Sequence, residues 1–527
     1  MTDKRLALCT LTVAVVGVAL RSLVAAGGWL YWDDLILQSK ARELGLGAAL
    51  FTPHDGHLMP AAWLIEWLLA TVAPLSWPAA LAVLVCLQAL AAAAVAWSAR
   101  QFAGRWAPLP LAVYLATPLT LPVTTWLAAG INALPMHAAM AMVLGHAARN
   151  RRGDMAKAAG WLVLGLAFNE RALLITPLAL VALACWGYRD RVRPLATVLA
   201  APTLAWAMVY AALARPDGTA DERVSLTALL WRGYVEGLIP TAAGGPWVWG
   251  RWHPSPPFAQ APLPLILLGV LVVGVVLWWG RRQAIVWLPA AVYPVVPILG
   301  LWWLRSSGET AVEIVLTLRH LSEVAVPVAL ALAVLQSRLR IPPVAVAAFV
   351  VSSLVSAFTL AQSWAQQPAR EYFAALDQPG LNQEVPAEVL LPVAHPHNRL
   401  DHLAPWLVTP STTQPSLIDA HGTRHRATLL PSRTGADTCT RGGEATIALD
   451  GPLYDLEWTV LLNYNASADG TAAVSLGGDP VEVPVAQGLN QVWVRVAGAA
   501  PEITVRSDVD LCFGRSEVGQ LILTDGN

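Results

Sequence analysis

Long apolar runs separated by short polar connections fill the first 364 residues, and this alternation constrains the fold more than any other feature. The runs fall at about 6–28, 58–75, 78–99, 107–121, 124–147, 156–168, 172–187, 195–214, 262–280, 284–304, 321–336 and 341–363. Only 13% of all residues are charged, against about 25% in an average soluble protein. The chain is therefore predicted to be a polytopic α-helical membrane protein.

Basic residues in the connections predict how the spans are oriented. Arginine and lysine gather at 100–105, 149–157, 189–193, 281–282 and 338–340, and they also precede the first run. The positive-inside rule places these segments in the cytoplasm, which requires an odd number of crossings between the outer loop at Asp33 and Arg100. We therefore interpret 58–75 as a helix at or dipping into the outer surface. The prediction is about eleven spans in the plasma (inner) membrane, with a cytoplasmic N-terminus and an extracytoplasmic tail.

The composition changes after Trp364, where charged residues become as frequent as in a soluble domain. We predict a multi-span membrane domain at 1–364, an irregular extracytoplasmic region at 365–440 and a β-sandwich at 441–527. From Glu444 on, short alternating runs such as LEWTVLLNY and QVWVRV are separated by Gly, Asp and Asn turns, as in an antiparallel sandwich. In an extracytoplasmic tail, Cys439 and Cys512 could form a disulfide that joins the two ends of the sandwich.

Two adjacent carboxylates, Asp33 and Asp34, follow the first apolar run in the stretch WLYWDDLILQSKARELG. Ionisable groups at the edge of a bilayer are costly unless they line a water-filled, functional cavity. Neighbouring side chains point in different directions, so one carboxylate can face a cavity while the other caps the helix that begins at LILQ. Asp34 is better placed for the cap. Asp33 is therefore the preferred candidate for a base that deprotonates a hydroxyl group.

A second polar cluster, HDGH at 54–57, lies in the same outer loop. His54, Asp55 and His57 are residue types that orient a sugar or that, with the aspartates, hold a divalent cation such as Mg²⁺ or Mn²⁺. Asp-Gly is also an ordinary turn signal, so a purely structural turn explains the cluster equally well. The sequence identifies no certain cofactor.

Further charged residues fall in polar breaks between the spans. Glu170 and Arg171 lie in the FNER turn between two runs that are short for a bilayer of about 30 Å. They are candidates for a cavity wall, and a local ion pair is the structural alternative. Arg305, Arg319 and His320 lie on the predicted outer side, against the usual charge bias. They could bind phosphate. The structural alternatives are anchoring at the membrane edge and ion pairs with Glu309 and Glu313.

The order of these features is similar to that of a known superfamily. A first helix leads into an outer loop with a DD pair, and a juxtamembrane stretch begins at Pro60. A basic RQFAGR turn, further spans and an outer β-rich tail follow. In layout, most of the chain resembles the GT-C superfamily of membrane glycosyltransferases. The tail is similar to the carbohydrate-binding-module-like tails found among actinobacterial cell-wall arabinofuranosyl- and mannosyltransferases.

This resemblance implies a function. In that family an acidic residue of the first outer loop deprotonates the acceptor, the donor is a polyprenyl-phosphate sugar, and transfer usually inverts the anomeric centre. The implied partners are such a donor, a cell-envelope glycan or lipid acceptor, and the bilayer. Carried over to this chain, the implied roles fall to Asp33 or Asp34 for the base, Arg319 and His320 for the donor phosphate, and Glu170 or Arg171 for the pocket wall.

Two other functions are compatible with a multi-span chain. A lipid-linked-sugar flippase or transporter would need broken helices and ionisable groups near the bilayer midplane, often in repeated halves. The charges here gather instead at the predicted outer rim. A non-catalytic glycan-binding envelope protein would need one anchoring span, which leaves the others unexplained. The net charge of −1 gives no indication of nucleic-acid binding.

Overall fold

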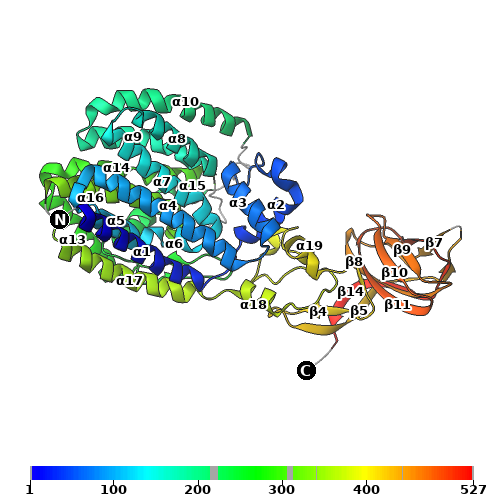
Figure 1. The fold of residues 1–527 in the computed structure, drawn as a ribbon. Helices are drawn as coiled ribbons and strands as arrows, with labels where there is room; N and C mark the ends of the chain where they lie inside the picture. The colour runs from blue at the N-terminus through cyan, green and yellow to red at the C-terminus, as the bar shows by residue number, and fades with distance from the viewer. Residues whose placement is uncertain (1–2, 214–222, 305–311, 340, 442, 525–527) are drawn as a thin grey trace. The chain divides into compact units, whose positions relative to one another are not determined.

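The computed structural model describes residues 3–213, 223–304, 312–339, 341–441 and 443–524. The chain divides into two compact units, Met1–Gln367 and Pro368–Asn527, and each is described by itself. The first unit is almost entirely helical, and the second consists mainly of β-strands (Figure 1).

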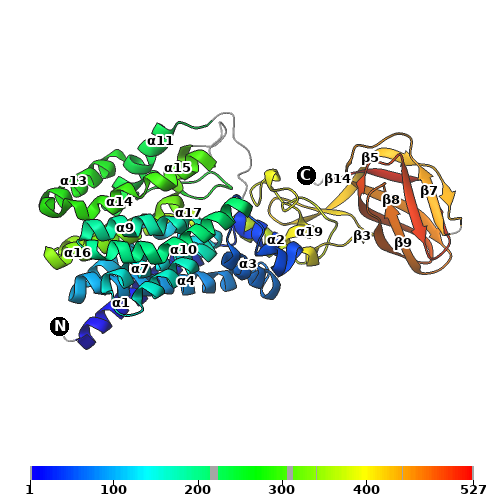
Figure 2. The same cartoon turned by 90° about the horizontal axis from the view of Figure 1, so that it is seen from above.

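The helical unit follows the apolar runs of the sequence. Its α-helices are α1 (Asp3–Ala26), α2 (Asp33–Ala49), α3 (Pro60–Val72), α4 (Trp77–Ala103), α5 (Pro108–Ala116), α6 (Leu121–Thr125), α7 (Leu127–Arg149), α8 (Asp154–Phe168), α9 (Ile175–Trp186), α10 (Arg189–Leu213), α11 (Leu226–Trp231), α12 (Ile239–Ala242), α13 (Leu263–Trp279), α14 (Leu288–Val292), α15 (Val295–Leu304), α16 (Ala325–Arg338) and α17 (Pro343–Trp364). Short 3-10 or π-helical segments join them at η1 (Gly104–Trp106), η2 (Pro118–Thr120), η3 (Glu170–Leu174), η4 (Arg232–Leu238), η5 (Arg281–Trp287), η6 (Val312–Thr317) and η7 (Arg319–Val324), and β1 (Trp249–Gly250) pairs with β2 (Phe258–Ala259). The long helices run side by side in two perpendicular views (Figure 1, Figure 2).

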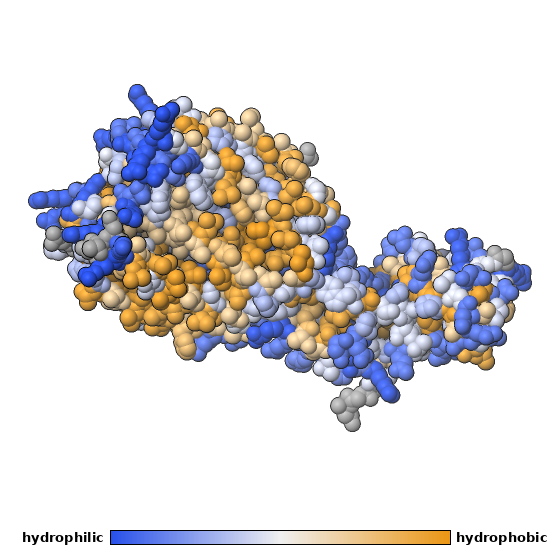
Figure 3. All heavy atoms as spheres, viewed as in Figure 1, coloured by the Kyte–Doolittle hydropathy of each residue, from blue (hydrophilic) through white to orange (hydrophobic). Residues whose placement is uncertain are grey.

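Long apolar helices with exposed side chains make the first unit a membrane domain. Among the described residues, seven stretches are long and apolar enough to cross a membrane, namely Lys4–Ala26, Trp77–Trp106, Leu127–Arg149, Arg189–Leu213, Arg281–Leu304, Arg319–Arg338 and Pro343–Ala375. Leu8, Leu11 and Val15 of α1 are exposed, and hydrophobic residues cover much of the visible surface of the helical unit (Figure 3). The chain is thus a polytopic α-helical membrane protein. The number of eleven spans remains a prediction.

The segment interpreted as a surface helix forms α3, which has 13 residues. At about 1.5 Å per residue it is too short to cross a hydrocarbon core of about 30 Å. It packs against α2, which belongs to the loop that carries the aspartate pair. Because both helices are short and adjoin each other (Figure 1), the HDGH turn that joins them is held at the end of a compact helix pair.

Helix α7 lies at the centre of the helical unit and contacts α4 and α8. Its sequence, LAAGINALPMHAAMAMVLGHAAR, is rich in Ala and Gly, and small residues let neighbouring membrane helices approach closely. A Cβ atom on Gly130 would lie 2.6 Å from the Val123 carbonyl oxygen, and one on Gly145 would lie 2.5 Å from Ser98 Oγ. Glycine at these two positions therefore lets α7 pack closely against its neighbours.

A break between α8 and α9 brings polar backbone into the helical unit. Helix α8 ends at Phe168, Asn169 is extended with φ −163°, and η3 follows before α9 begins. The Asn169 side chain accepts a hydrogen bond from the Arg171 amide at 2.9 Å, which satisfies one of the free amides at the start of η3. Glu170 and Arg171 are the first two residues of η3, so this break places both side chains inside the helical unit.

The second unit is a β-sandwich preceded by short helices. Its elements are α18 (Pro368–Ala375), η8 (Pro392–Ala394), α19 (Leu400–Leu403), η9 (Pro405–Leu407), β3 (Ser411–Thr412), β4 (Ser416–Ile418), β5 (Arg424–Gly435), β6 (Thr438–Cys439), β7 (Glu444–Ala448), β8 (Leu456–Ala466), β9 (Gly470–Ser475), β10 (Val481–Val485), β11 (Gly488–Gly498), β12 (Glu502–Ser507), β13 (Leu511–Phe513) and β14 (Ser516–Leu523). One sheet has the order β10-β9-β12-β7, and the other has the order β3-β11-β8-β14-β5-β4, with β13 between β8 and β6.

Alternating side chains from both sheets form one core. Val494 of β11 and Val460 of β8 are fully buried, and so are Ile447 and Ile503 of the four-stranded sheet. The alternation expected from runs such as LEWTVLLNY is therefore present in β8, and the tail contains the sandwich.

The region from 365 to 440, which was predicted to be irregular, contains β3 to β6. Strand β5 pairs with β14 in antiparallel register, with an irregularity between Val518 and Gly519 near Pro431. Most side chains of β5 are exposed or half-buried, so RHRATLLPSRTG lacks the alternation that marks a half-buried strand. Proline also argues against a strand except at edges and bulges. The sandwich therefore begins earlier in the chain than its sequence pattern indicates.

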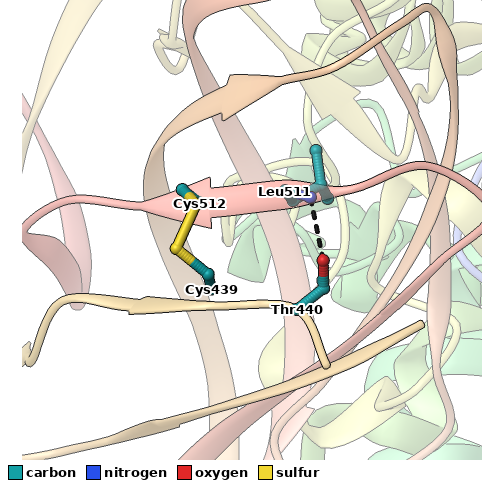
Figure 4. Close-up of a disulfide and its surroundings, with 4 residues drawn as sticks. All are labelled: Cys439, Thr440, Leu511 and Cys512. Atoms are coloured by element: carbon teal, nitrogen blue, oxygen red, sulfur yellow. Dashed lines mark hydrogen bonds between the residues drawn. A yellow bond between two sulfur atoms is a disulfide. The ribbon is translucent and has the colours of Figure 1, made fainter. Parts of the chain in front are cut away.

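A disulfide joins Cys439 of β6 to Cys512 of β13 (Figure 4). The two cysteines are directly opposite each other in the ladder, and the Thr440 hydroxyl accepts a hydrogen bond from the Leu511 amide at 2.9 Å. Strand β5 precedes this bridge and β14 follows it, so the bridge lies within the sandwich and does not join its two ends.

Candidate functional site

The two adjacent aspartates have different environments. Asp34 is fully buried, and both of its oxygens accept hydrogen bonds: Oδ2 from the Tyr31 amide at 2.9 Å and Oδ1 from the Ala128 amide at 2.7 Å. Ala128 lies in the first turn of α7, so Asp34 caps α7. The expectation that Asp34 caps its own helix is therefore wrong, because the N-cap of α2 is Trp32, which makes no side-chain cap.

Burial raises the pKa of Asp34 well above its usual value, although the amide hydrogen bonds from Tyr31 and Ala128 favour the charged form. Its two oxygens are occupied by backbone amides. Asp33, in contrast, is only partly buried and lines a cavity inside the helical unit. Of the pair, Asp33 is the carboxylate that a bound molecule can reach.

The HDGH segment is a tight turn that presents three side chains to the same cavity. The amide of His54 bonds to the His57 carbonyl at 3.0 Å, and the amide of His57 bonds to the His54 carbonyl at 2.8 Å. Asp55 and Gly56 have φ values of 49° and 74°, as in the type I′ turn that Asp-Gly favours. The Tyr210 hydroxyl of α10 donates to the Gly56 carbonyl at 2.8 Å. His54, Asp55 and His57 all line the cavity.

Glu170 from the break after α8 is paired with this turn. Its Oε1 lies 2.7 Å from His57 Nδ1. Burial alone would raise the pKa of Glu170, but the charge and the hydrogen bond of His57 outweigh burial and hold the pKa below its usual value. Glu170 therefore contributes a carboxylate to the cavity wall and orients the His57 ring.

Two arginines line the cavity as well, Arg171 from the same break and Arg319 from η7. Arg171 makes an ion pair with the buried Glu323 at 2.7 Å and donates to the His320 carbonyl at 2.7 Å. The Arg319 guanidinium lies 4.3 Å from the ring centre of Trp126, and its Nε donates to His320 Nε2 at 3.1 Å. Arg319 supplies the positive charge of this edge at the start of η7, which we call the cationic edge. His320 is neutral in this arrangement, because its Nε2 accepts from Arg319, and it contributes an Nδ1–H donor.

The cavity has a volume of about 310 Å³, at the lower end of the range of about 300–1,000 Å³ for small-molecule sites. Most of the residues singled out from the sequence line it, namely Asp33, His54, Asp55, His57, Glu170, Arg171, Arg319 and His320. Asp34 does not line it, and Arg305 lies outside the described residues. Three polar lining residues were not predicted: Asn132, Asn169 and Tyr210. A polar asparagine in the otherwise apolar stretch AAGINALPM was the sequence signal for Asn132.

Several buried polar atoms of the wall have no hydrogen-bond partner among the described residues. They are His54 Nε2, Asn132 Oδ1 and Glu170 Oε2. An unpaired buried donor or acceptor costs about 1–3 kcal/mol. A polar molecule with hydroxyl groups in the cavity would satisfy these atoms, so the wall is suited to a hydroxylated ligand.

Three of the residues also come close enough to be considered as metal ligands. Asp33, His54 and Asp55 each offer an atom within 4.8 Å of the others. However, Lys40 Nζ lies 3.3 Å from His54 Nδ1. An ammonium group can only donate, so Nδ1 accepts and the proton of the neutral ring is on Nε2. Neither nitrogen then has a free lone pair for a cation, and the residues present do not fit a divalent metal bound through His54.

Comparison with protein-family models and with curated proteins finds no match for this chain. Solved structures that are similar to it include the following two. The crystal structure of ArnT from Cupriavidus metallidurans in the apo state matches with 14% sequence identity and a TM-score of 0.43, over 73% of this chain and 83% of that chain. The cryo-EM structure of the arabinofuranosyltransferase AftD from Mycobacteria matches with 12% identity and a TM-score of 0.37, over 100% of this chain and 59% of that chain. Both TM-scores lie below 0.5, and the function proposed next depends on the geometry of the cavity.

Proposed function

We propose that this protein is a membrane glycosyltransferase that moves a sugar from a polyprenyl-phosphate donor to a cell-envelope glycan or lipid acceptor. The observation that carries the proposal is a single cavity that combines a reachable carboxylate, Asp33, with a cationic edge formed by Arg319 and His320. Sugar transfer from a phosphate donor needs a base for the incoming hydroxyl and positive charge for the departing phosphate. The cavity supplies both.

The reaction takes place as one displacement. Asp33 accepts the proton of an acceptor hydroxyl while that oxygen forms a bond to the anomeric carbon of the donor. The bond between the anomeric carbon and the phosphate oxygen breaks, and the polyprenyl phosphate leaves with the electron pair. Arg319 and His320 stabilise the charge of that phosphate. One displacement inverts the anomeric centre, and no second carboxylate attacks the sugar.

The apolar side of the cavity suits the lipid part of such a donor. Helix α15 lines it with apolar residues, among them Val296, Leu301 and Leu304. Val296 and Leu304 are also 44% and 49% exposed, so the cavity wall is continuous with the apolar surface of a candidate membrane span. A polyprenyl chain can lie along this surface while its phosphate reaches the cationic edge.

We place the reaction at the outer face of the plasma membrane. The basic connections and Lys4 and Arg5 put the N-terminus in the cytoplasm. With about eleven spans, the loop that carries Asp33 and the β-sandwich are both extracytoplasmic. The disulfide between Cys439 and Cys512 supports this placement of the sandwich, because disulfides persist in oxidising compartments.

The test is sugar transfer by the purified full-length protein in detergent. Synthetic polyprenyl-phosphate pentoses and hexoses are supplied as donors, with an oligosaccharide acceptor. We expect release of polyprenyl phosphate together with a glycosylated acceptor. If no donor reacts while labelled donor lipid moves between leaflets of liposomes that contain the protein, the protein is a flippase and the proposal is wrong.

A further inference from the structure

His137 lies in the middle of α7 and is fully buried, although it is not part of the cavity wall. Its Nδ1 is 3.1 Å from the Tyr114 hydroxyl of α5, and its Nε2 is 3.3 Å from the Ser322 hydroxyl of η7. Ser322 in turn donates to the carbonyl of Arg319 at 3.1 Å. A buried chain of hydrogen bonds therefore connects two helices to the segment that carries the cationic edge.

The direction of every hydrogen bond in this chain can be assigned. A carbonyl only accepts, so the one hydroxyl proton of Ser322 goes to Arg319. Ser322 must then accept from His137, which places the ring proton on Nε2 and leaves Nδ1 as an acceptor for the Tyr114 hydroxyl proton. The neutral Nε2–H form of His137 satisfies all of these bonds. All of these hydrogen bonds are therefore donated in the same direction, from Tyr114 through His137 and Ser322 to the backbone carbonyl of Arg319.

The segment at the end of this series of hydrogen bonds, η7, is not a conformation that its own backbone favours. Residue Leu318, just before η7, has φ 56°, a conformation that costs a residue other than glycine about 1–3 kcal/mol. The 3-10 helix that follows has poorer hydrogen-bond geometry than an α-helix. Two side chains from outside η7 reach it: Arg171 donates to the His320 carbonyl, and His137 bonds to Ser322. Ser322 belongs to η7 itself and donates to the Arg319 carbonyl, so His137 acts on the segment through this hydroxyl.

We infer that His137 is a positioning residue, which acts through Ser322 to hold the Arg319–His320 segment in the geometry that receives the donor phosphate. The inference rests on the proposed function, because it assigns the cationic edge to a phosphate. It goes beyond that function by making recognition of the donor, but not of the acceptor, depend on a buried residue outside the cavity. An ordinary core histidine would affect the stability of the protein without this selectivity.

The experiment measures binding of a long-chain polyprenyl phosphate and steady-state transfer with the full-length protein. The variants are His137→Leu, His137→Gln and Ser322→Ala. His146→Gln is the control, because His146 is a buried histidine of the same helix whose partner is Asp154. Glutamine can replace the Nε2–H donor of histidine, whereas leucine cannot.

We expect His137→Leu and Ser322→Ala to weaken polyprenyl-phosphate binding and to raise the KM for the donor by about tenfold, the equivalent of one lost hydrogen bond. The KM for the acceptor should stay unchanged. His137→Gln should recover most of the affinity, and His146→Gln should bind as the wild type does. Ser322→Ala keeps the test valid if His137→Leu does not fold, because it removes only one hydroxyl.

Two results would overturn the inference, and they are distinguishable. In the first, wild type transfers sugar, but His137→Leu and Ser322→Ala bind the lipid phosphate as wild type does, or their KM values for donor and acceptor rise together. His137 then has a structural role only. If wild type neither binds polyprenyl phosphate nor transfers sugar, the proposed function fails and the inference fails with it.

Discussion

At the scale of single residues, Asp33 and Asp34 separate a chemical role from a structural one. The sequence alone indicated that one of the pair faces a cavity and the other caps a helix, and the structure gives each aspartate one of these environments. The helix that Asp34 caps was not predictable, because the Ala128 amide lies 94 residues away in the chain. Capping rules use nearby sequence, whereas this cap depends on tertiary packing.

Replacing Asp34 with alanine should destabilise the protein. The change leaves two buried amides, those of Tyr31 and Ala128, without acceptors, which we expect to cost about 2–4 kcal/mol. Thermal unfolding in detergent measures the effect, with Asp33→Ala as the matched control. Equal unfolding temperatures for the two variants would show that Asp34 does not cap α7.

The pair formed by His57 and Glu170 should make stability depend on pH. The pKa of Glu170 is held below 4.5, so the carboxylate stabilises the folded state above that pH and the contribution is lost as the pH falls through the lowered value. His57→Gln should therefore cost about 1–2 kcal/mol at neutral pH. Unfolding curves of wild type and variant should stay apart from pH 7 down to the usual glutamate pKa of 4.5 and converge only below it, as Glu170 becomes protonated. Parallel curves would contradict the pairing.

At the scale of elements, the apolar runs predicted the helices well, since a membrane-spanning helix satisfies its backbone hydrogen bonds within its own segment. The break after Phe168 was visible as two runs too short for a bilayer. The β-sheet was harder. Strand β5 has mostly exposed or half-buried side chains and contains Pro431, so its place in the sandwich depends on pairing with β14 and not on any local pattern.

Helix α15 offers a direct test of the cavity. Gly300 lines the cavity, and a Cβ atom there would meet nothing within 4 Å. Gly300→Leu should therefore place an isobutyl group in the cavity from a Cβ position that is free of clashes, and we expect donor KM to rise by about tenfold or more, or transfer to be lost. Gly274→Leu in α13 is the control, because that position also has no neighbour within 4 Å and lies outside the cavity. Full activity of Gly300→Leu would place the donor elsewhere.

The disulfide should stabilise the second unit alone. Cys439 and Cys512 are separated by 73 residues, and closing a loop of that length is worth about 4 kcal/mol in the chain-entropy model. Changing both cysteines to serine should lower the unfolding temperature of the sandwich in the full-length protein and leave that of the helical unit unchanged. Limited proteolysis at rising temperature distinguishes the two units, and a loss of protection in the helices would contradict this expectation.

At the scale of the whole molecule, the cavity brings together residues from Asp33 to His320. Their chemistry could be proposed from the sequence because each is an ionisable group next to an apolar run. Neutral contributors such as Asn132 and Tyr210 were missed, since the sequence does not show that Asn132 lines the cavity or that Tyr210 bonds to the HDGH turn. Lys40, whose contact with His54 argues against a metal ligand there, could not be identified from the sequence and is known only from its distance to His54.

The measurement that tests the central claim most directly is the rate of sugar transfer by Asp33→Asn, compared with wild type and with Asp34→Asn. If Asp33 is the base, Asp33→Asn should fold normally and lose about 10²–10⁴ in kcat. Asp34→Asn should keep most of its activity in whatever fraction remains folded, because an amide oxygen can still accept one of the two buried amides. A folded Asp33→Asn variant that transfers sugar at the wild-type rate would contradict the account.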